Sequence, residues 1–161
     1  MIVAIMADSH DNLPLIRRAL ERFRVEGAET LIHTGDYISP FAVREILKFG
    51  GPVEGCFGNN DGERTGIREI WPRVDNPPKM LSLGGRRILL AHDLEKTPPD
   101  LLKRADVVAF GHTHKPAVER VRLDDRERLH INPGETGGWL YGRATAALLD
   151  TGTLEAQILE L

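Results

Sequence analysis

The sequence of 161 residues lacks paired cysteines and any long apolar run. Cys56 has no partner for an intramolecular disulfide, and its apolar neighbours predict a small buried side chain rather than a reactive thiol. The apolar N-terminus, Met1 to Ala7, is too short for the core of a signal peptide and has no basic flank. No run approaches the length of a membrane span. We therefore expect a cytoplasmic protein with no membrane partner.

The sequence also lacks an excess of positive charge. Its 21 Lys and Arg residues stand against 24 Asp and Glu residues, for a formal net charge of −3. Such a protein has no general attraction for nucleic acid or for an anionic membrane, so a nucleic-acid partner is disfavoured. The arginines at 17, 18, 22 and 24 are interpreted as one solvated helix face.

Strand and helix signals alternate along the first two-thirds of the chain, and hairpin signals follow. Continuous apolar or alternating runs predict strands over 2–7, 30–34, 53–57, 80–83, 87–91, 106–110, 117–123, 129–132, 144–150 and 154–159. Helices are predicted from Asn12 to Gly27, from Ser39 to Gly50, over about 65–71 and after Thr97. Ten strands are more than a single open sheet usually contains. We therefore expect a mixed α/β fold of two packed sheets flanked by helices. The length favours a single domain over residues 1–161.

Seven side chains that can ligate a divalent cation follow the ends of five predicted strands. In chain order they are Asp8, His10, Asp36, Asn59, His92, His112 and His114. Open α/β sheets place their sites beyond the carboxyl ends of the strands, so these ends can deliver all seven to one crevice. Carboxylate, amide and imidazole together suit a pair of divalent cations, and such a pair cleaves phosphate esters.

The local spacing of the candidates also favours a shared site. Asp8 and His10 are two residues apart, as are His112 and His114, and in an extended chain such side chains point the same way. Glycine directly precedes three candidates, at Gly35, Gly58 and Gly111. A glycine lets the backbone turn sharply and lie close to an ion or substrate.

Each candidate alone is weak evidence, because a strand-end Asp or Asn is usually a turn former and a lone histidine is more often structural. His33 and His130 lie outside the ordered set. We expect His33 to support the structure or a neighbouring ligand, and His130 to be packed or exposed. The metal interpretation depends on all five signals occurring together in order.

The order Asp-x-His, Gly-Asp, Gly-Asn-x-Asp, His, Gly-His-x-His resembles the calcineurin-like metallophosphoesterase superfamily. The segments 8–12, Asp-Ser-His-Asp-Asn, and 132–134, Asn-Pro-Gly, resemble its small bacterial and archaeal phosphodiesterase branch. The resemblance extends from Met1 to about Gly134 and implies two β-sheets flanked by helices. It implies a first metal on Asp8, His10 and His114, a second on Asn59, His92 and His112, and Asp36 bridging both with one oxygen per ion.

The same resemblance implies a dinuclear metal-dependent phosphoesterase that hydrolyses phosphodiesters by attack of a hydroxide shared between the metals. Mn²⁺ is the first expectation for the metal, and Fe, Ni²⁺ and Zn²⁺ also suit the ligands. Candidate catalytic residues are Asp36, Asn59 and Asn60, and candidate substrate contacts are Asn12 and Asn60. The expected partner is a small phosphodiester, and a homodimer or homotetramer is common among small family members.

Three positions depart from the family pattern. Larger members carry Gly-Asn-His-Asp, where this chain has Asn60 as the third residue. An amide cannot donate a proton at neutral pH, and general acid help is worth ~10²–10⁴-fold, so we expect weak activity on esters with poor leaving groups. Asp93 replaces the usual glycine and is expected to orient His92 or to face solvent; Glu135 replaces the usual serine at the pocket rim.

Two alternatives of other classes stay open at this point. One branch of the superfamily is a non-enzymatic scaffold for protein partners, but its members lose ligands that this chain keeps. A nuclease would need a basic face, which the composition does not supply. Substrate choice is expected in the rim loops over 62–76 and 134–142, where Trp71, Trp139 and Tyr141 could stack on an aromatic group, pack in the core or contact another subunit.

Overall fold

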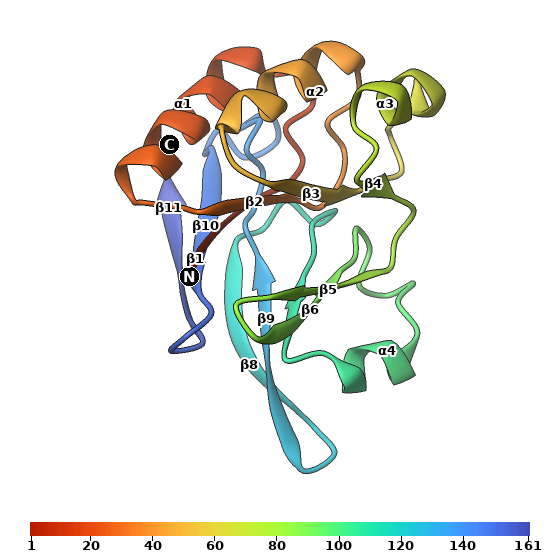
Figure 1. Cartoon of the computed structure of the whole chain (residues 1–161), viewed down its shortest axis with the longest axis vertical. Coiled ribbons are helices and arrows are strands. Elements are labelled where there is room, and N and C mark those ends of the chain that lie inside the picture. The colour runs from red at the N-terminus through yellow and green to blue at the C-terminus, as the bar shows by residue number, and fades with distance from the viewer.

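Two β-sheets pack face to face in the computed structural model, which describes residues 1–161, and helices cover the outer faces (Figure 1). The helices are α1 (Leu13–Val25), α2 (Pro40–Ile46), the 3₁₀ turn η1 (Leu47–Phe49), α3 (Arg64–Ile70) and α4 (Pro99–Arg104). This arrangement confirms the predicted two-sheet α/β fold.

The first sheet lies under α1, α2 and α3 and has the order β11-β10-β1-β2-β3-β4 (Figure 1). Its strands are β1 (Ile2–Met6), β2 (Thr30–His33), β3 (Val53–Cys56), β4 (Val74–Asp75), β10 (Thr145–Asp150) and β11 (Glu155–Glu160). Strands β1 to β4 are parallel, and β10 joins β1 in the antiparallel sense. The two-residue β4 was not predicted, because so short a strand leaves no periodic pattern.

The second sheet has the order β5-β6-β7-β9-β8. Its strands are β5 (Lys79–Leu83), β6 (Arg86–Leu90), β7 (Val107–Ala109), β8 (Ala117–Leu123) and β9 (Arg126–Asn132). The pairs β6–β7 and β7–β9 are parallel, whereas β5–β6 and β8–β9 are antiparallel hairpins. The hairpins predicted around Gly84-Gly85 and Asp124-Asp125 are therefore present.

Alternation along the buried strands explains why both faces of each sheet are apolar. On β1, Val3 and Ile5 face the second sheet, whereas Ala4 and Met6 pack under the helices. On β6, Leu89 faces α4 while its neighbours face the first sheet. Because side chains alternate across a strand, a continuous apolar run supplies two cores at once.

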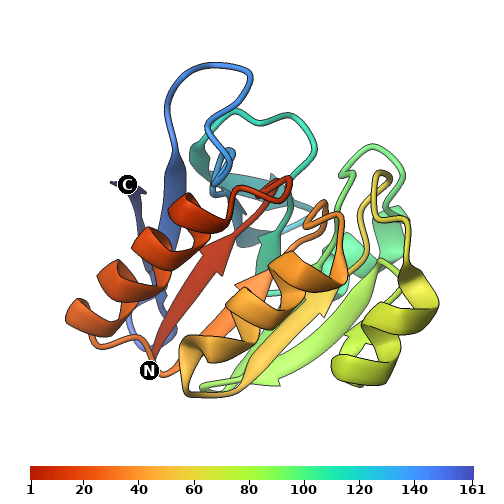
Figure 2. The same cartoon turned by 90° about the horizontal axis from the view of Figure 1, so that it is seen from above.

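Parallel pairing brings the carboxyl ends of β1, β2 and β3 to one edge of the molecule. The turns after these strands gather there with the loops from the second sheet (Figure 2). Trp71, for which stacking at the rim and packing in the core were both open, lies in the core, where its indole N–H donates to Val53 O at 3.0 Å. No helix combines the length and the apolar character needed to cross a membrane.

Candidate metal centre

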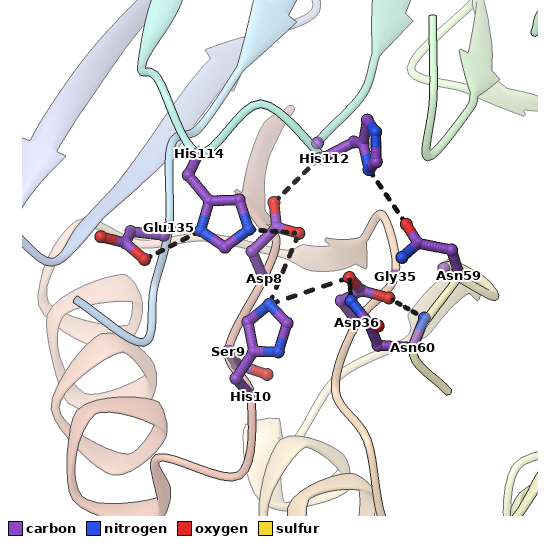
Figure 3. Close-up of polar contacts among 12 residues, drawn as sticks. Asp8, Ser9, His10, Gly35, Asp36, Asn59, Asn60, His112, His114 and Glu135 are labelled. Carbon is purple, nitrogen blue, oxygen red and sulfur yellow. Dashed lines mark hydrogen bonds and ion pairs between the residues drawn. The ribbon is translucent and has the colours of Figure 1, made fainter. Parts of the chain in front are cut away.

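All seven predicted ligands lie in the turns that follow strands β1, β2, β3, β6 and β7. Figure 3 labels all of them except His92. The turn after β1 carries Asp8 and His10, and the turn after β7 carries His112 and His114. The structure thus brings together side chains that are up to about a hundred residues apart, since the His112 amide N–H donates to Asp8 Oδ2 at 3.0 Å.

The first group of ligand atoms belongs to Asp8, His10 and His114. Asp8 Oδ1 lies 3.6 Å from His114 Nε2 and 4.0 Å from His10 Nε2. The two imidazole rings stack with their centroids 5.2 Å apart. Three ligand atoms within 4.8 Å of one another can share one cation.

The second group belongs to Asn59, His92 and His112. Asn59 Oδ1 lies 2.8 Å from His92 Nε2 and 2.9 Å from His112 Nδ1. His92 Nδ1 faces Thr34 O at 2.9 Å. A carbonyl oxygen requires a proton on Nδ1, so the neutral imidazole presents a lone pair at Nε2, as a metal ligand must.

Asp36 lies between the two groups. Its Oδ2 is 3.7 Å from His10 Nε2 and 3.4 Å from His92 Nε2. Its Oδ1 instead accepts the Asn60 amide N–H at 2.8 Å, while Asn60 Nδ2 donates to Oδ2 at 2.7 Å. Oδ2 is thus the Asp36 oxygen that lies near a ligand nitrogen of each group, and the expected bridge with one oxygen per ion stays a prediction.

Buried atoms without partners show that these residues suit cations. Asp8 Oδ1 and His10 Nε2 are buried and have no hydrogen-bond partner. In the neutral form of His92, its Nε2 and Asn59 Oδ1 are two acceptors in contact, which is unfavourable unless a positive charge joins them. An unpaired buried acceptor costs ~1–3 kcal/mol, and a cation would remove that cost in both groups.

The electrostatics of the two carboxylates differ. Burial raises the pKa of Asp8 to about 7. Burial also acts to raise the pKa of Asp36, but His92 and the two Asn60 donors outweigh it and hold that pKa well below its usual range. Asp36 is thus an anion at neutral pH, whereas Asp8 is poised to exchange its proton for a cation.

The ligands are aimed by turns and not by extended backbone, contrary to the expectation from their spacing. Asp8, His10, Asp36, His112 and His114 all have positive φ, from 41° to 69°. Residues other than glycine pay ~1–2 kcal/mol for this conformation, and such strain concentrates at functional sites. Gly58 allows close packing, since a Cβ there would overlap the Asp36 carboxylate.

Asp61 holds two of these turns together and was missed as a functional residue. Its carboxylate accepts the amide N–H groups of Asp36 at 3.0 Å, Gly58 at 2.7 Å and Ile38 at 2.7 Å. The only sequence signal was its place in Gly58-Asn59-Asn60-Asp61, because two of its three partners, Asp36 and Ile38, lie more than twenty residues away. The buried Glu135 contacts a ligand from behind, with Oε2 2.8 Å from His114 Nδ1.

Other predicted residues have different surroundings. The amide of Asn12 is engaged within the chain, with Nδ2 donating to Gly137 O at 2.8 Å and Oδ1 accepting Leu15 N–H at 3.4 Å. Asp93 neither orients His92 nor points freely to solvent, because it binds Lys96 at 2.8 Å and lies 3.8 Å from His112 Nε2.

The two remaining histidines are not ligands in this arrangement. His33 is buried, accepts Gly35 N–H at Nδ1 (3.1 Å) and contacts Ser9 Oγ through Nε2 (3.0 Å). It therefore braces the turns that carry Asp8 and Asp36, as expected of a supporting residue. His130 is packed in β9 and away from the ligands.

A cavity of about 360 Å³ opens beside the second group of ligands. The ligands Asn59 and His92 line it, together with residues that include Phe57, Pro78 and Lys96. A larger hollow of about 690 Å³ lies along β8 and β11 and includes none of the seven ligands. Only the smaller cavity is placed to receive a substituent of a substrate at the ligands.

Comparison with known proteins gives matches over nearly the whole chain. Residues 1–154 match the model of the calcineurin-like phosphoesterase superfamily domain. The chain is 36% identical over 160 residues to phosphodiesterase MJ0936 of Methanocaldococcus jannaschii, covering 94% of this chain and 93% of that protein. It is 30% identical over 149 residues to phosphodiesterase YfcE of Escherichia coli, covering 83% of this chain and 78% of that protein.

Comparison with solved structures also finds a phosphodiesterase. The structure of an archaeal phosphodiesterase superposes with a TM-score of 0.85 at 34% identity, and all of both chains is covered. A zinc complex of Vps29 from Entamoeba histolytica has a TM-score of 0.68 at 18% identity, with 99% of both chains covered, which is a likeness of fold alone.

Proposed function

Because this chain belongs to the calcineurin-like phosphoesterase superfamily, we propose that it is a dinuclear metal-dependent phosphodiesterase acting on small phosphodiesters. One observation carries the dinuclear part: Asp36 Oδ2 lies within 3.7 Å of a ligand nitrogen from each group. The superfamily and the named phosphodiesterases among its relatives support the hydrolase class.

The residues divide the work between two cations. Asp8, His10 and His114 would hold the first, Asn59, His92 and His112 the second, and Asp36 Oδ2 both. When bound, two divalent cations activate a water molecule and stabilise negative charge on the phosphoryl oxygens. Mn²⁺ suits this mixture of imidazole, amide and carboxylate, as Fe, Ni²⁺ and Zn²⁺ also do.

Asn60 positions Asp36 and supplies no proton. Its two donors hold both oxygens of the Asp36 carboxylate at 2.7–2.8 Å. An amide remains neutral throughout the accessible pH range and cannot protonate a departing alkoxide. Substrates whose leaving groups need no proton, such as activated aryl phosphodiesters, should therefore be turned over best.

The test combines metal binding with turnover. Metal-free protein is titrated with Mn²⁺ by calorimetry, and the loaded protein is assayed with bis(p-nitrophenyl) phosphate. We expect two Mn²⁺ per chain and measurable hydrolysis, with both lost in Asp36→Asn. The matched control is Asp125→Asn, which removes an exposed carboxylate from the β8–β9 turn. A protein that binds two Mn²⁺ without turnover of mono- or diesters would instead be a scaffold.

A further inference from the structure

Glu135 places a buried carboxylate directly behind a proposed metal ligand. It is 1% exposed, and its Oε2 lies 2.8 Å from His114 Nδ1 (Figure 3). A carboxylate can only accept here, so the proton of a neutral His114 is on Nδ1. The lone pair is then on Nε2, the nitrogen that faces Asp8 Oδ1.

The same carboxylate also binds the backbone of a neighbouring loop. The amide N–H of Leu140 donates to Oε1 at 2.9 Å and to Oε2 at 3.1 Å, and that of Tyr141 donates to Oε1 at 2.8 Å. Both oxygens of Glu135 are therefore occupied by three N–H groups, one from the ligand and two from the loop.

This loop, residues 136–142, has exposed apolar side chains and lies against the first ligand group. Trp139 is 63%, Leu140 65% and Tyr141 54% exposed. The Trp139 indole N–H donates to His10 O at 3.2 Å, and the Gly137 amide donates to Asp8 O at 3.1 Å. The loop thus contacts the backbone of two ligands, and through Glu135 the side chain of a third.

We infer that Glu135 is a positioning residue that couples the first metal site to the 136–142 loop: it holds His114 with Nε2 towards the cation and anchors the loop amides with the same two oxygens. This inference rests on the proposed metal centre. Reorientation of His114 would require Glu135 to move, and a moved carboxylate would release Leu140 and Tyr141. Binding of the cation and ordering of the loop should therefore favour each other.

The chemistry of the side chain shows why a glutamine could not serve both roles. If the amide oxygen of Glu135→Gln faced His114, its NH₂ would face the N–H groups of the loop. If the oxygen faced the loop, the NH₂ would face His114 Nδ1 and favour the tautomer with the proton on Nε2. Either orientation loses one function, although the size of the side chain is unchanged.

The first experiment needs neither metal nor activity. Long-range ¹H–¹⁵N spectra of metal-free wild type report which ring nitrogen of His114 carries the proton. We expect the Nδ1–H form in wild type. In Glu135→Gln the amide oxygen should turn to the two loop N–H groups and its NH₂ to His114 Nδ1, so that signature should be lost. A wild type with the proton on Nε2 would overturn the inference, because Glu135 would not then be selecting the ligand form.

The second experiment measures Mn²⁺ affinity by competition with a chromogenic chelator. Loss of a carboxylate behind a ligating histidine typically weakens metal binding ~10–100-fold, and we expect this for Glu135→Gln. The matched control is Glu160→Gln, an exposed carboxylate paired only with Arg143. A wild type that binds no Mn²⁺ overturns the proposed function, whereas equal affinities in wild type and Glu135→Gln overturn only the role of Glu135.

The third experiment tests the coupling in the wild type, so it does not depend on the folding of a variant. Hydrogen exchange at the Leu140 and Tyr141 amides is compared in the presence of Mn²⁺ and of a chelator. We expect slower exchange with Mn²⁺, and the difference should vanish in Glu135→Gln. Exchange in the wild type that is indifferent to Mn²⁺ would show that loop and metal are independent and would overturn the coupling.

Discussion

The two groups of ligands meet at Asp36 but differ in burial, charge and bonding. The first group contains a carboxylate, and the exposed fractions of its side chains are 0% for Asp8, 22% for His10 and 10% for His114. The second contains no carboxylate, and beside the buried His92 it includes the exposed Asn59 and a His112 side chain that is 41% exposed. Asp8 Oδ1 and His10 Nε2 have no partner, whereas Asn59 Oδ1 contacts both of its imidazoles.

This difference predicts unequal affinities. A cation at the first group would meet a buried carboxylate and atoms that need a partner, and Glu135 already fixes His114. A cation at the second group would meet no carboxylate besides the shared Asp36, and two of the three ligands, Asn59 and His112, are exposed to solvent. The first group should therefore bind its cation more tightly, and the second should exchange its cation more readily with solvent.

The largest effect is expected from removing the charge of the first group. Asp8→Asn keeps the size of the side chain but takes away the anion, so the first cation should be lost and kcat/KM for bis(p-nitrophenyl) phosphate should fall about 10³-fold. The matched variant Asn59→Ala should lose the second cation and keep the first. Calorimetric titration of both variants decides the comparison: Asn59→Ala should keep the tighter Mn²⁺ step and Asp8→Asn the weaker one. Equal affinity for the remaining Mn²⁺ in the two variants would refute the asymmetry.

A smaller effect, in the opposite direction, is expected from Asn60→His. An imidazole in place of the amide could donate a proton to a poor leaving group, so activity on an alkyl phosphodiester should rise ~10²-fold. Activity on an activated aryl diester should change little. The measurement is the ratio of kcat/KM for the two substrates at matched metal content. If this ratio is unchanged while both cations are bound, the missing proton donor does not limit this enzyme.

Much of this fold could be predicted from apolar runs because both faces of the central strands are buried. The run from Ile2 to Ala7 gave β1, and the seven ligands were identified because each follows such a strand. Residues that act through long-range contacts left no such signal. Asp61 was visible only as the last residue of Gly58-Asn59-Asn60-Asp61, and Glu135 only as a departure from the family pattern; the folded chain alone brings them to the Asp36 turn and to His114.

The sequence also did not predict the local backbone conformation of the turns that carry the ligands. Spacing by two residues indicated that Asp8 and His10 share a direction, but the cause is a left-handed turn, with φ of 49° and 41°. Trp71 lies in a predicted rim loop, as Trp139 and Tyr141 do, and substrate stacking, core packing and a subunit contact all stayed open for the three. Packing separated them: Trp71 fills the core at 2% exposure, while the other two stay on the surface.

A substitution in the second group should reduce the difference in Mn²⁺ affinity between the two groups. Asn59→Asp places a carboxylate in the second group and should tighten its cation about tenfold, which corresponds to 1.4 kcal/mol. Calorimetric titration of metal-free wild type with Mn²⁺ should show two steps separated by at least about tenfold. In Asn59→Asp the steps should move together. A single titration step in the wild type, with equal Mn²⁺ affinity at both groups, would contradict the predicted difference in affinity.

The smallest effect concerns the stability of the metal-free protein as a function of pH. Burial raises the pKa of Asp8 from 3.8 to about 7, so its protonated form stabilises the fold at low pH. This contribution is complete below about pH 4 and is lost as the pH rises through about 7. His33, whose pKa is lowered to about 3 by burial, acts in the opposite sense between about pH 3 and 6.5.

The contribution of Asp8 is isolated by subtracting the profile of Asp8→Asn, in which His33 is unchanged. Between about pH 5 and about pH 8, metal-free wild type should lose at least about 1 kcal/mol of unfolding free energy relative to the variant, measured by denaturant titration. Mn²⁺ should restore the unfolding free energy of the wild type at about pH 8, because the cation replaces the proton in the first group. It should raise the unfolding free energy of the variant less. Parallel profiles for the two proteins would mean that the buried Asp8 carboxylate is compensated without a cation.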